Sequence, residues 1–389
     1  MSSDLLAKLD NTYTVRLLEE LVRINSIVGQ EGELAQFLCA ELDRLGFDCE
    51  LQEVEPGRSN VYARLQGRGP GRRLNFNGHT DTVSVCEGWE SDPFTPVVKE
   101  GRLYGLGACD MKAGIACAVT TLKAFVESGY PFRGELSFSG VIDEEAYSKG
   151  ARAMLATDLA ACDAIVVAEA YAGDADKPIP LGITGKVLYE LTVQGFAAHG
   201  FYPHQGINAV EDAARIIASL DQLRMREHPD FGRGNICTLK IEGGYQVYSV
   251  VVPDRCRVEI NRLLVPGETT ESAVEDMEEL IRSLELRSRV EVSLKPPQYE
   301  PFVMDRHEPI FDVFHQVYQE VMGFEPVYAY SPGITDANVF AGEGGIPCLH
   351  LGPQRGSFHQ PNEYVEIESL ASVSRMFALI AARFLGGSG

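Results

Sequence analysis

Residues 113–142, AGIACAVTTLKAFVESGYPFRGELSFSGVI, decide the fold class of this chain. The segment Ala113–Val126 is rich in small and apolar residues and predicts a closely packed helix, and Glu135–Ile142 predicts a buried strand. Three further strands are expected upstream, at Asp48–Val54, Asn60–Leu65 and Arg73–Asn77. Strands that alternate with helices along the chain are typical of an α/β layer fold.

A different order of elements begins near Gly185. The pattern predicts a strand, a helix, two strands, a helix and a strand, at Lys186–Val193, Gly206–Leu223, Asn235–Ile241, Arg255–Leu264, Thr270–Leu284 and Arg289–Leu294. This βαββαβ order is that of a ferredoxin-like domain, and Pro296-Pro297 indicates a linker behind it. We therefore expect a larger domain built from residues 1–183 and 297–389, with a smaller domain of residues 184–296 inserted between its halves.

The composition excludes several classes of partner. The formal charge of the 389 residues is −22, which argues against nucleic acid and anionic membranes. No run of about 18 apolar residues predicts a membrane span, and residues 1–14 lack the pattern of a signal peptide, so a cytoplasmic location is expected. The nine cysteines include no CxxC pair, which predicts reduced thiols rather than disulfides or a cysteine-ligated zinc site.

A first group of polar residues, Gly78-His79-Thr80-Asp81-Thr82, directly follows the strand that ends at Asn77. The end of a strand is where α/β folds place their binding sites. Because His79 and Asp81 are two residues apart, their side chains face the same way in extended backbone, and Asp81 can hold the second ring nitrogen of a metal-ligating His79. A turn or helix-cap aspartate beside a structural histidine is the alternative.

Acidic residues recur at similar places further along. Asp110 lies just before the small-residue helix, where it is either an N-cap or a carboxylate that bridges two cations. Asp143-Glu144-Glu145 close the strand that ends at Ile142, and three adjacent acids repel one another unless cations compensate. Since neighbouring side chains point apart, Glu145 can bind a metal while Glu144 faces the reacting water. A solvated acidic turn is the alternative.

Two more candidates complete a ligand set. Glu169 follows the apolar run Ala164–Ala168, and His359 lies in the turn-rich loop Gly352–Glu363. Each is weak alone, since lone acids and histidines are usually structural. Together the set supplies the mixed nitrogen and oxygen ligands that suit zinc, cobalt or manganese: His79, Asp110, Glu145, Glu169 and His359. Two such cations would hold a water between them, with Glu144 as its general base.

These motifs together resemble the zinc-dependent aminoacylase/carboxypeptidase family that includes acetylornithine deacetylase and succinyl-diaminopimelate desuccinylase. The resemblance covers essentially the whole chain. It rests on NGHTDTV from Asn77, on the segment from Trp89 to LYGLGACDMK, on the DEE of residues 143–145, on Glu169, and on HQPNEYV from His359. It implies a dizinc aminopeptidase/carboxypeptidase-like catalytic domain that carries an inserted lid and dimerisation domain.

The resemblance also assigns roles at the proposed metal site. His79 and Glu169 would bind one metal ion, and Glu145 and His359 the other. Asp110 would bridge the two ions. Asp81 would orient His79, Glu144 would be the general base, and the peptide bond between Asp110 and Met111 would be cis.

Four residues outside the metal cluster receive roles in the same way. His199 would reach the active site of a neighbouring subunit and stabilise the oxyanion, which makes a homodimer through the inserted domain the expected assembly. Asn208 would be a structural or substrate contact, and Arg262 would bind a substrate carboxylate. Thr335, in Gly333-Ile334-Thr335-Asp336, would contact substrate. The alternatives are a core or surface histidine at position 199 and a surface strand residue at position 262.

The chain departs from the family pattern on the substrate side. Leu106 stands where an arginine is common, Val250 or Ser249 where many members have an asparagine, and Ile334 where a glycine is usual. The metal chemistry is therefore expected to be intact, while the substrate's identity stays open.

The main functional hypothesis is hydrolysis of the amide bond of an N-acyl amino acid, and a glutamate at position 169 fits acylase and carboxypeptidase members. A carboxypeptidase or dipeptidase with the same site is the alternative, and ureido hydrolysis is a third. A noncatalytic metal-binding relative would have lost the base or a ligand, and none is missing.

Overall fold

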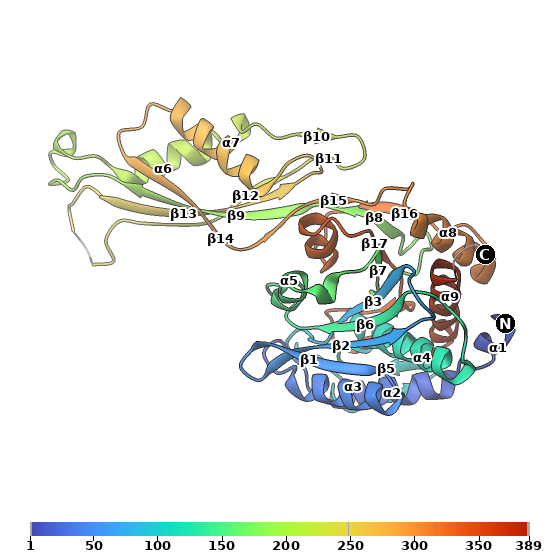
Figure 1. The fold of residues 1–389 in the computed structure, drawn as a ribbon. Helices are drawn as coiled ribbons and strands as arrows, with labels where there is room; N and C mark the ends of the chain where they lie inside the picture. Colours follow the sequence, from blue (N-terminus) through green and yellow to red (C-terminus); the bar gives the residue numbers. More distant parts are fainter. Residues whose placement is uncertain (1, 248, 387–389) are drawn as a thin grey trace. The chain divides into compact units, whose positions relative to one another are not determined.

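The computed structural model describes residues 2–247 and 249–386 (Figure 1). The chain divides into two compact units, which we call unit 1 and unit 2. Unit 1 contains Met1–Leu181, Met304–Ala329 and Thr335–Gly389, and unit 2 contains Gly182–Val303 and Tyr330–Ile334. Unit 2 thus lies between parts of unit 1 in the sequence, and the short return at Tyr330–Ile334 is a feature that the sequence did not predict.

Unit 1 is built on a six-stranded sheet. In spatial order its strands are β1 (Asp48–Glu55), β2 (Arg58–Gln66), β6 (Glu135–Val141), β3 (Arg73–His79), β7 (Ala164–Val167) and β17 (Cys348–His350). The last four strands are mutually parallel, whereas β1 and β2 are antiparallel additions at one edge. Every residue of β6 is buried, as expected of a strand covered on both faces. The carboxyl ends of β6, β3 and β7 therefore meet at one edge of the sheet.

Helices cover this sheet on both sides. Figure 1 shows α2 (Asn11–Arg23), α3 (Gly32–Arg44) and α4 (Ala113–Ser128) on one side and α5 (Lys149–Leu155) on the other. Helix α4 packs against β3, β6 and α9 (Ile367–Leu385), while α8 (Pro309–Met322) packs against α9. Gly114 permits the close approach of α4, because a Cβ at this position would lie 1.8 Å from the carbonyl oxygen of Ala168.

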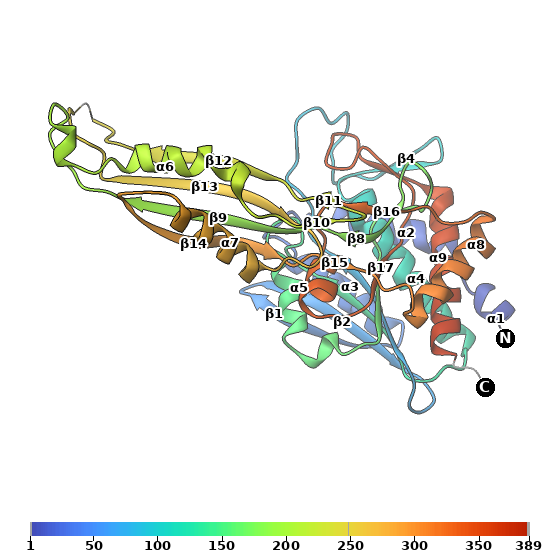
Figure 2. The ribbon, with the colours of Figure 1, turned by 90° about the horizontal axis from the view of Figure 1, so that it is seen from above.

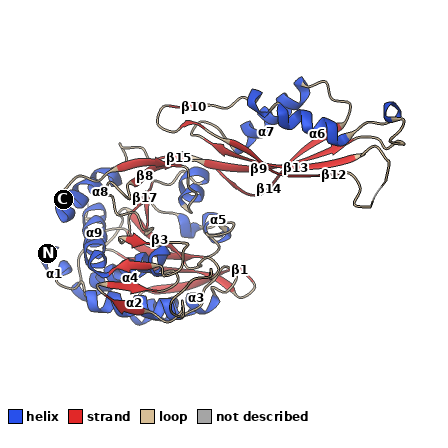
Figure 3. Ribbon diagram, turned by 180° about the vertical axis from the view of Figure 1, so that it is seen from behind, coloured by secondary structure: helices blue, strands red, loops and turns tan. Residues whose placement is uncertain are grey.

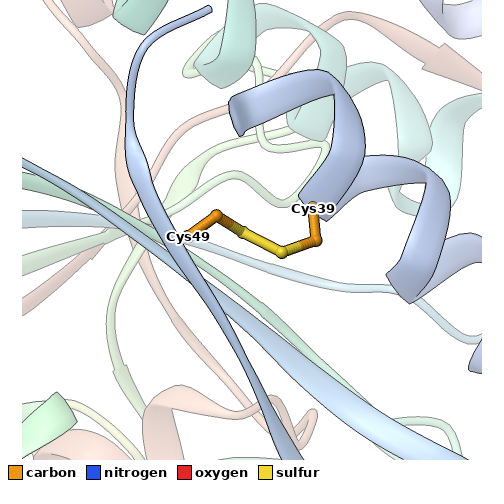
Figure 4. Close-up of a disulfide and its surroundings, with 2 residues drawn as sticks. All are labelled: Cys39 and Cys49. Carbon is orange, nitrogen blue, oxygen red and sulfur yellow. A yellow bond between two sulfur atoms is a disulfide. The ribbon is translucent and has the colours of Figure 1, made fainter. Parts of the chain in front are cut away.

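A disulfide joins Cys39 in α3 to Cys49 in β1 (Figure 4). The prediction that all cysteines are reduced thiols is therefore wrong for this pair. The chain reverses at Gly46, whose φ is 94°, and this turn brings the two Cα atoms to 5.7 Å, within the range that a disulfide requires. Six other cysteines are free thiols: Cys86, Cys117, Cys162, Cys237, Cys256 and Cys348.

Unit 2 contains a four-stranded antiparallel sheet with two helices on one face (Figures 2 and 3). Its elements follow the chain as β9 (Gly185–Gln194), α6 (Ala209–Ala218), β12 (Ile236–Gly243), β13 (Arg255–Leu264), α7 (Thr270–Ser283) and β14 (Arg289–Tyr299), and the strands lie in the order β12-β13-β9-β14. The predicted ferredoxin-like order is confirmed. A small hairpin of β10 (Glu227–His228) and β11 (Gly232–Arg233) is added to it.

Strand β14 does not end at the double proline. It continues through Pro296 and Pro297 to Tyr299, with a shift in its pairing with β9 between Lys295 and Tyr299. A proline lacks the N–H that a strand interior needs, and β14 tolerates two because it lies at the edge of the sheet. The double proline therefore marks an irregularity in the strand rather than its end.

Arg262 lies in the core of unit 2. Burial alternates along β13, so Arg262 shares the covered face with Val258 and Ile260 and has no exposed surface. Its guanidinium donates to Glu268 at 2.7 Å and to Asp276 at 2.9 Å. The expectation that Arg262 binds a substrate carboxylate is therefore corrected, because the side chain has no exposed surface and its Nη2 already donates to these two carboxylates.

The remaining short strands belong to two smaller sheets. Three strands, β15 (Phe302–Val303), β8 (Ile179–Ile183) and β16 (Tyr328–Ser331), lie where the chain passes between the units. In unit 1, β4 (Val97–Lys99), β5 (Arg102–Tyr104), β19 (Tyr364–Glu366) and β18 (Arg355–Gly356) form a second four-stranded sheet. No helix within the described residues is long and apolar enough to cross a membrane.

Replacing Arg262 by methionine is expected to lower the free energy of unfolding by about 3–5 kcal/mol, because Glu268 and Asp276 would lose their shared buried cation. Urea unfolding followed by circular dichroism measures the loss. Arg257→Met on the same strand is the control, since Arg257 is 44% exposed and lies 3.7 Å from Glu190. That change is expected to cost less than about 1 kcal/mol. Equal losses in the two variants would contradict this account of Arg262.

Candidate metal centre

The carboxyl ends of three neighbouring parallel strands supply most of the site. His79 is the last residue of β3, Glu144 and Glu145 follow β6, and Glu169 follows β7. The strands are in register at this end, since His79 lies opposite Val141 of β6. The predicted convergence of these side chains is therefore a direct result of the parallel pairing.

Two loops bring the remaining candidate ligands. Asp110 lies in the helical turn η1 (Ala108–Lys112) that leads into α4, and its peptide bond to Met111 is cis, as the family resemblance predicted. His359 lies in the loop between β18 and β19 and has a φ of 57°. A left-handed backbone is unfavourable for histidine, and such conformations concentrate at functional sites.

The two histidines face opposite oxygens of one carboxylate. His79 Nε2 lies 3.2 Å from Asp110 Oδ1 and 3.4 Å from Glu169 Oε1. His359 Nε2 lies 3.2 Å from Asp110 Oδ2 and 2.8 Å from Glu145 Oε1. The structure thus brings all five predicted ligands together as two sets of donors that share Asp110.

Glu144 lies at the same place. Ligand atoms of His79, Glu144 and Glu169 are within 4.8 Å of one another, as are those of His79, Asp110 and Glu145. The Glu144 side chain is half-buried. Burial, reinforced by the negative charge of neighbouring carboxylates, raises the pKa of Glu144 well above its ordinary value. A carboxyl group with a raised pKa is suited to accept and return a proton near neutral pH.

Asp81 contacts His79 through its main chain rather than through the side chain that the sequence analysis expected. Its main-chain oxygen lies 2.9 Å from His79 Nδ1, and this oxygen orients the ring when Nδ1 carries the proton. The Asp81 carboxylate instead accepts hydrogen bonds from the backbone N–H groups of Glu144 at 3.2 Å and Glu145 at 2.9 Å. Asp81 therefore connects His79 to the loop that carries the proposed general base.

The donor set fits divalent cations. Within the described residues, no lysine or arginine forms an ion pair with Asp110, Glu145 or Glu169, so these carboxylates lack a permanent cation. Burial disfavours a charged His79, but contact with Asp110 and Glu169 outweighs it and raises the pKa of His79 well above its usual value. Hydrogen bonds to Asp110 and Glu145 raise the pKa of His359 to about 10. Two imidazoles among these carboxylates form the mixed nitrogen and oxygen donor set that suits divalent cations.

The sequence of this chain matches the peptidase family M20/M25/M40 over residues 75–383, a range that includes the whole cluster. The chain belongs to this family. It is 30% identical to a succinyl-diaminopimelate desuccinylase from Alkalilimnicola ehrlichii over 382 residues, which cover 96% of this chain and 99% of that relative.

Two solved structures share the fold. A tripeptidase from Staphylococcus aureus is 23% identical, with a TM-score of 0.77 over 97% of this chain and 99% of the other. A dinuclear metal-binding M20 peptidase from Bacillus subtilis is 19% identical, with a TM-score of 0.72 over 97% and 99%. Membership of the M20 family makes this protein a hydrolase that acts on amide bonds.

Two residues of this M20 protein that were expected to contact substrate, Asn208 and Thr335, make hydrogen bonds within the protein. The side chain of Asn208 caps helix α6, where it accepts hydrogen bonds from the N–H groups of Val210 and Glu211 at 3.0 and 3.3 Å. Thr335 is buried, and its hydroxyl lies 3.0 Å from His350 Nε2. The structure thus places the side chain of Asn208 at a helix end and the hydroxyl of Thr335 inside unit 1.

His199 is an exposed residue of unit 2. Its Nδ1 accepts a hydrogen bond from the N–H of Phe201 at 3.2 Å. The neutral ring therefore carries its proton on Nε2, which is then a hydrogen-bond donor. Among the departures from the family pattern, Leu106 is buried in unit 1 and Ile334 is half-buried in unit 2, while the backbone oxygen of Val250 accepts from Gly200 in unit 2.

Sequence reasoning missed two buried acids near the cluster. Asp336 follows Thr335 and is 1% exposed, and burial raises its pKa to about 7. Glu363 is also 1% exposed and accepts hydrogen bonds from the backbone around Asp110. Both residues lie in motifs that the family resemblance had already identified. Their position beside a buried strand or turn is the sequence signal that could have marked them as candidate site residues.

Zinc binding by metal-stripped protein at pH 7 is expected to release about two protons, because His79 and His359 have raised pKa values and must lose a proton to bind a metal. Since His359 is protonated below about pH 10, metal affinity should rise with pH over this range. Calorimetry in two buffers of different ionisation enthalpy counts the protons. His359→Ala should release about one proton fewer, and zinc uptake without proton release would contradict this account.

Proposed function

We propose that this M20 protein is a dizinc hydrolase that removes the acyl group from an N-acyl amino acid. The observation that carries the proposal is the position of Asp110, whose two carboxylate oxygens each face a different histidine. A carboxylate in this position can bridge two cations. The separate donor sets on its two sides give each cation its own histidine and glutamate.

His79 and Glu169 would hold the first ion, and His359 and Glu145 the second, with Asp110 shared. Zinc suits a set of two imidazoles and three carboxylates, although cobalt and manganese accept the same ligands. Such ions, when bound, polarise a carbonyl group and lower the pKa of a water molecule between them. His359 is the exposed member of the set, so substrate reaches the site from its side.

Glu144 would carry the proton through the reaction. Its carboxylate accepts a proton from the attacking water while the water oxygen forms a bond to the amide carbon. The same carboxyl group then donates that proton to the nitrogen as the C–N bond breaks, which leaves a free acid and a free amine. Asp81 keeps Glu144 in reach, because it accepts a hydrogen bond from the Glu144 N–H.

Two observations support an acyl amino acid as the substrate class. The desuccinylase relative matches along nearly the whole chain. A glutamate at position 169 resembles acylase and carboxypeptidase members of the family rather than aminopeptidase-like ones. Peptidase activity is the alternative, because a tripeptidase shares the fold. A cytoplasmic location is part of the proposal. Free thiols such as Cys86, Cys162 and Cys237 are the state that a reducing compartment maintains, and the Cys39–Cys49 disulfide is an exception to it.

A substrate panel tests the proposed activity. Metal-stripped protein is assayed before and after addition of zinc, cobalt or manganese, with N-acetyl, N-succinyl and N-carbamoyl amino acids beside dipeptides of the same C-terminal residue. Metal-restored hydrolysis of the acyl substrates is the expected result. Faster hydrolysis of the dipeptides would favour the peptidase alternative, and no hydrolysis by the metal-loaded protein would overturn the proposal.

The proposal includes a homodimer in which His199 serves the site of the second copy. Its donor Nε2 suits an oxyanion that forms on the substrate carbonyl. Phe196, Phe201 and Tyr202 near it are 63%, 77% and 55% exposed, and large exposed apolar groups mark contact surfaces. These features support a contact between copies through unit 2.

Glu144→Ala is expected to bind metal as the wild type does but to lower kcat by about 10²–10⁴, the usual contribution of a general base. Metal analysis and steady-state kinetics on the same preparation measure the two effects separately. Glu145→Ala is the matched comparison, since loss of this neighbouring ligand should lower the metal content. Near-wild-type turnover by Glu144→Ala would remove Glu144 from the mechanism.

His199→Ala is expected to lower kcat and to leave the metal content unchanged. If His199 acts on the neighbouring copy, mixing His199→Ala with Glu144→Ala protein restores activity after subunit exchange. One of the two sites in such a hybrid then has both intact residues. Activity of the mixture compared with each variant alone measures the effect. A mixture that stays as inactive as its components, although mass spectrometry shows hybrid dimers, would place His199 outside the neighbouring site.

A further inference from the structure

Glu363 is a buried acid that the proposed mechanism does not use. It directly precedes β19, lies four residues after His359, and is 1% exposed. Its carboxylate accepts three backbone hydrogen bonds from the loop that holds Asp110. Oε2 accepts from the Gly107 N–H at 3.0 Å, and Oε1 accepts from the N–H groups of Cys109 at 2.9 Å and Asp110 at 3.1 Å.

Main-chain contacts extend this link in both directions. The Glu363 carbonyl oxygen accepts from the Gly105 N–H at 3.1 Å, and the next residue, Tyr364, pairs with Tyr104 in the ladder between β19 and β5. The segment that carries His359 and the segment that carries Asp110 are therefore joined by a strand ladder that ends in one carboxylate. From this point one segment leads to Asp110 and the other to His359.

The carboxylate is well suited to this position. The amides at the start of a helix have no partner within the helix, and Gly107, Cys109 and Asp110 lie at the start of η1, whose N-cap is Gly107. When the acid is ionised, its two oxygens accept from all three donors, and hydrogen bonds to a charged acceptor are the stronger kind. A glutamine would offer one oxygen and turn an NH₂ group toward a backbone N–H.

We propose that Glu363 is a positioning residue that sets the separation of Asp110 and His359 and thereby the affinity of the second metal position. The inference rests on the proposed two-metal site. The first position depends less on Glu363, because His79 and Glu169 are attached directly to β3 and β7 and only Asp110 reaches them from the loop. Loss of the Glu363 carboxylate should therefore separate the two metal affinities.

The test is zinc binding by metal-stripped Glu363→Gln in competition with a chromophoric chelator. The wild type is expected to bind two zinc ions. In the variant, the second ion should bind roughly ten- to hundredfold more weakly, the usual effect of a group that holds a metal ligand, and the first should change much less. Zinc-dependent kcat should then need correspondingly more free zinc.

Glu135→Gln is the matched control. Glu135 is 8% exposed and accepts hydrogen bonds from Tyr62 and Gln66, but it begins β6 at the end of the sheet away from the cluster. The same chemical change there should leave both zinc affinities unaltered. If Glu363→Gln does not fold, Glu363→Asp carries the test, because it keeps the charge and shortens the reach by one methylene. It should weaken the second ion selectively.

Three outcomes would count against these ideas in different ways. Unchanged zinc affinities in folded Glu363 variants would overturn the positioning role alone. Equal weakening of both ions would also overturn it, since the effect would then not concern the pair of Asp110 and His359. A wild-type protein that binds no zinc would overturn the proposed function, and the role of Glu363 with it.

Discussion

Electrostatic repulsion among the acids at one edge of the unit 1 sheet is the constraint on which the site depends. Glu144, Glu145 and Glu169 follow the ends of parallel strands, and Asp110 reaches them from the η1 turn. Like charges this close together destabilise a buried site unless positive charge separates them. The two histidines lie between these acids. The fold thus holds a cluster that is stable only with protons or cations in it, and this is a property that a metal site needs.

Rigid backbone around the cluster keeps the acids from moving apart. Strands β3, β6 and β7 fix the ligands at their ends, and the Asp81 carboxylate holds the Glu144-Glu145 backbone through two hydrogen bonds. Gly114 lets α4 lie directly against the end of β7. Ligand groups that are held before the metal arrives bind it more tightly than groups that must first be ordered, so these contacts act on the chemistry although none of them touches a substrate.

The sequence predicted the strand-end part of the site well because that part depends on periodicity and on the rule that binding groups follow parallel strands. It also predicted the βαββαβ order of unit 2. Its errors concern orientation and chain reversal. Arg262 lies two residues from buried Ile260 on one strand, so counting in twos would have placed it in the core. The partners of the Asp81 carboxylate depend on the position of another loop, which no local pattern records.

The Cys39–Cys49 bridge and the return of Tyr330–Ile334 to unit 2 were missed for a related reason. Both arise where distant or reversing segments meet. A sequence pattern describes each segment by itself and does not record contacts between distant segments. Glu363 is the clearest example. As a single residue it is an unremarkable acid before a strand, and its importance comes from a loop that lies far earlier in the chain.

The order of the ligands along the chain has a consequence for biosynthesis. His79, Asp110, Glu145 and Glu169 are translated before unit 2, and His359 is translated only after it. Proteins are made from the N-terminus, and early segments begin to fold first. The second donor set therefore cannot form on a polypeptide that ends before His359. A complete centre forms only after translation has passed through unit 2 and reached the loop of His359.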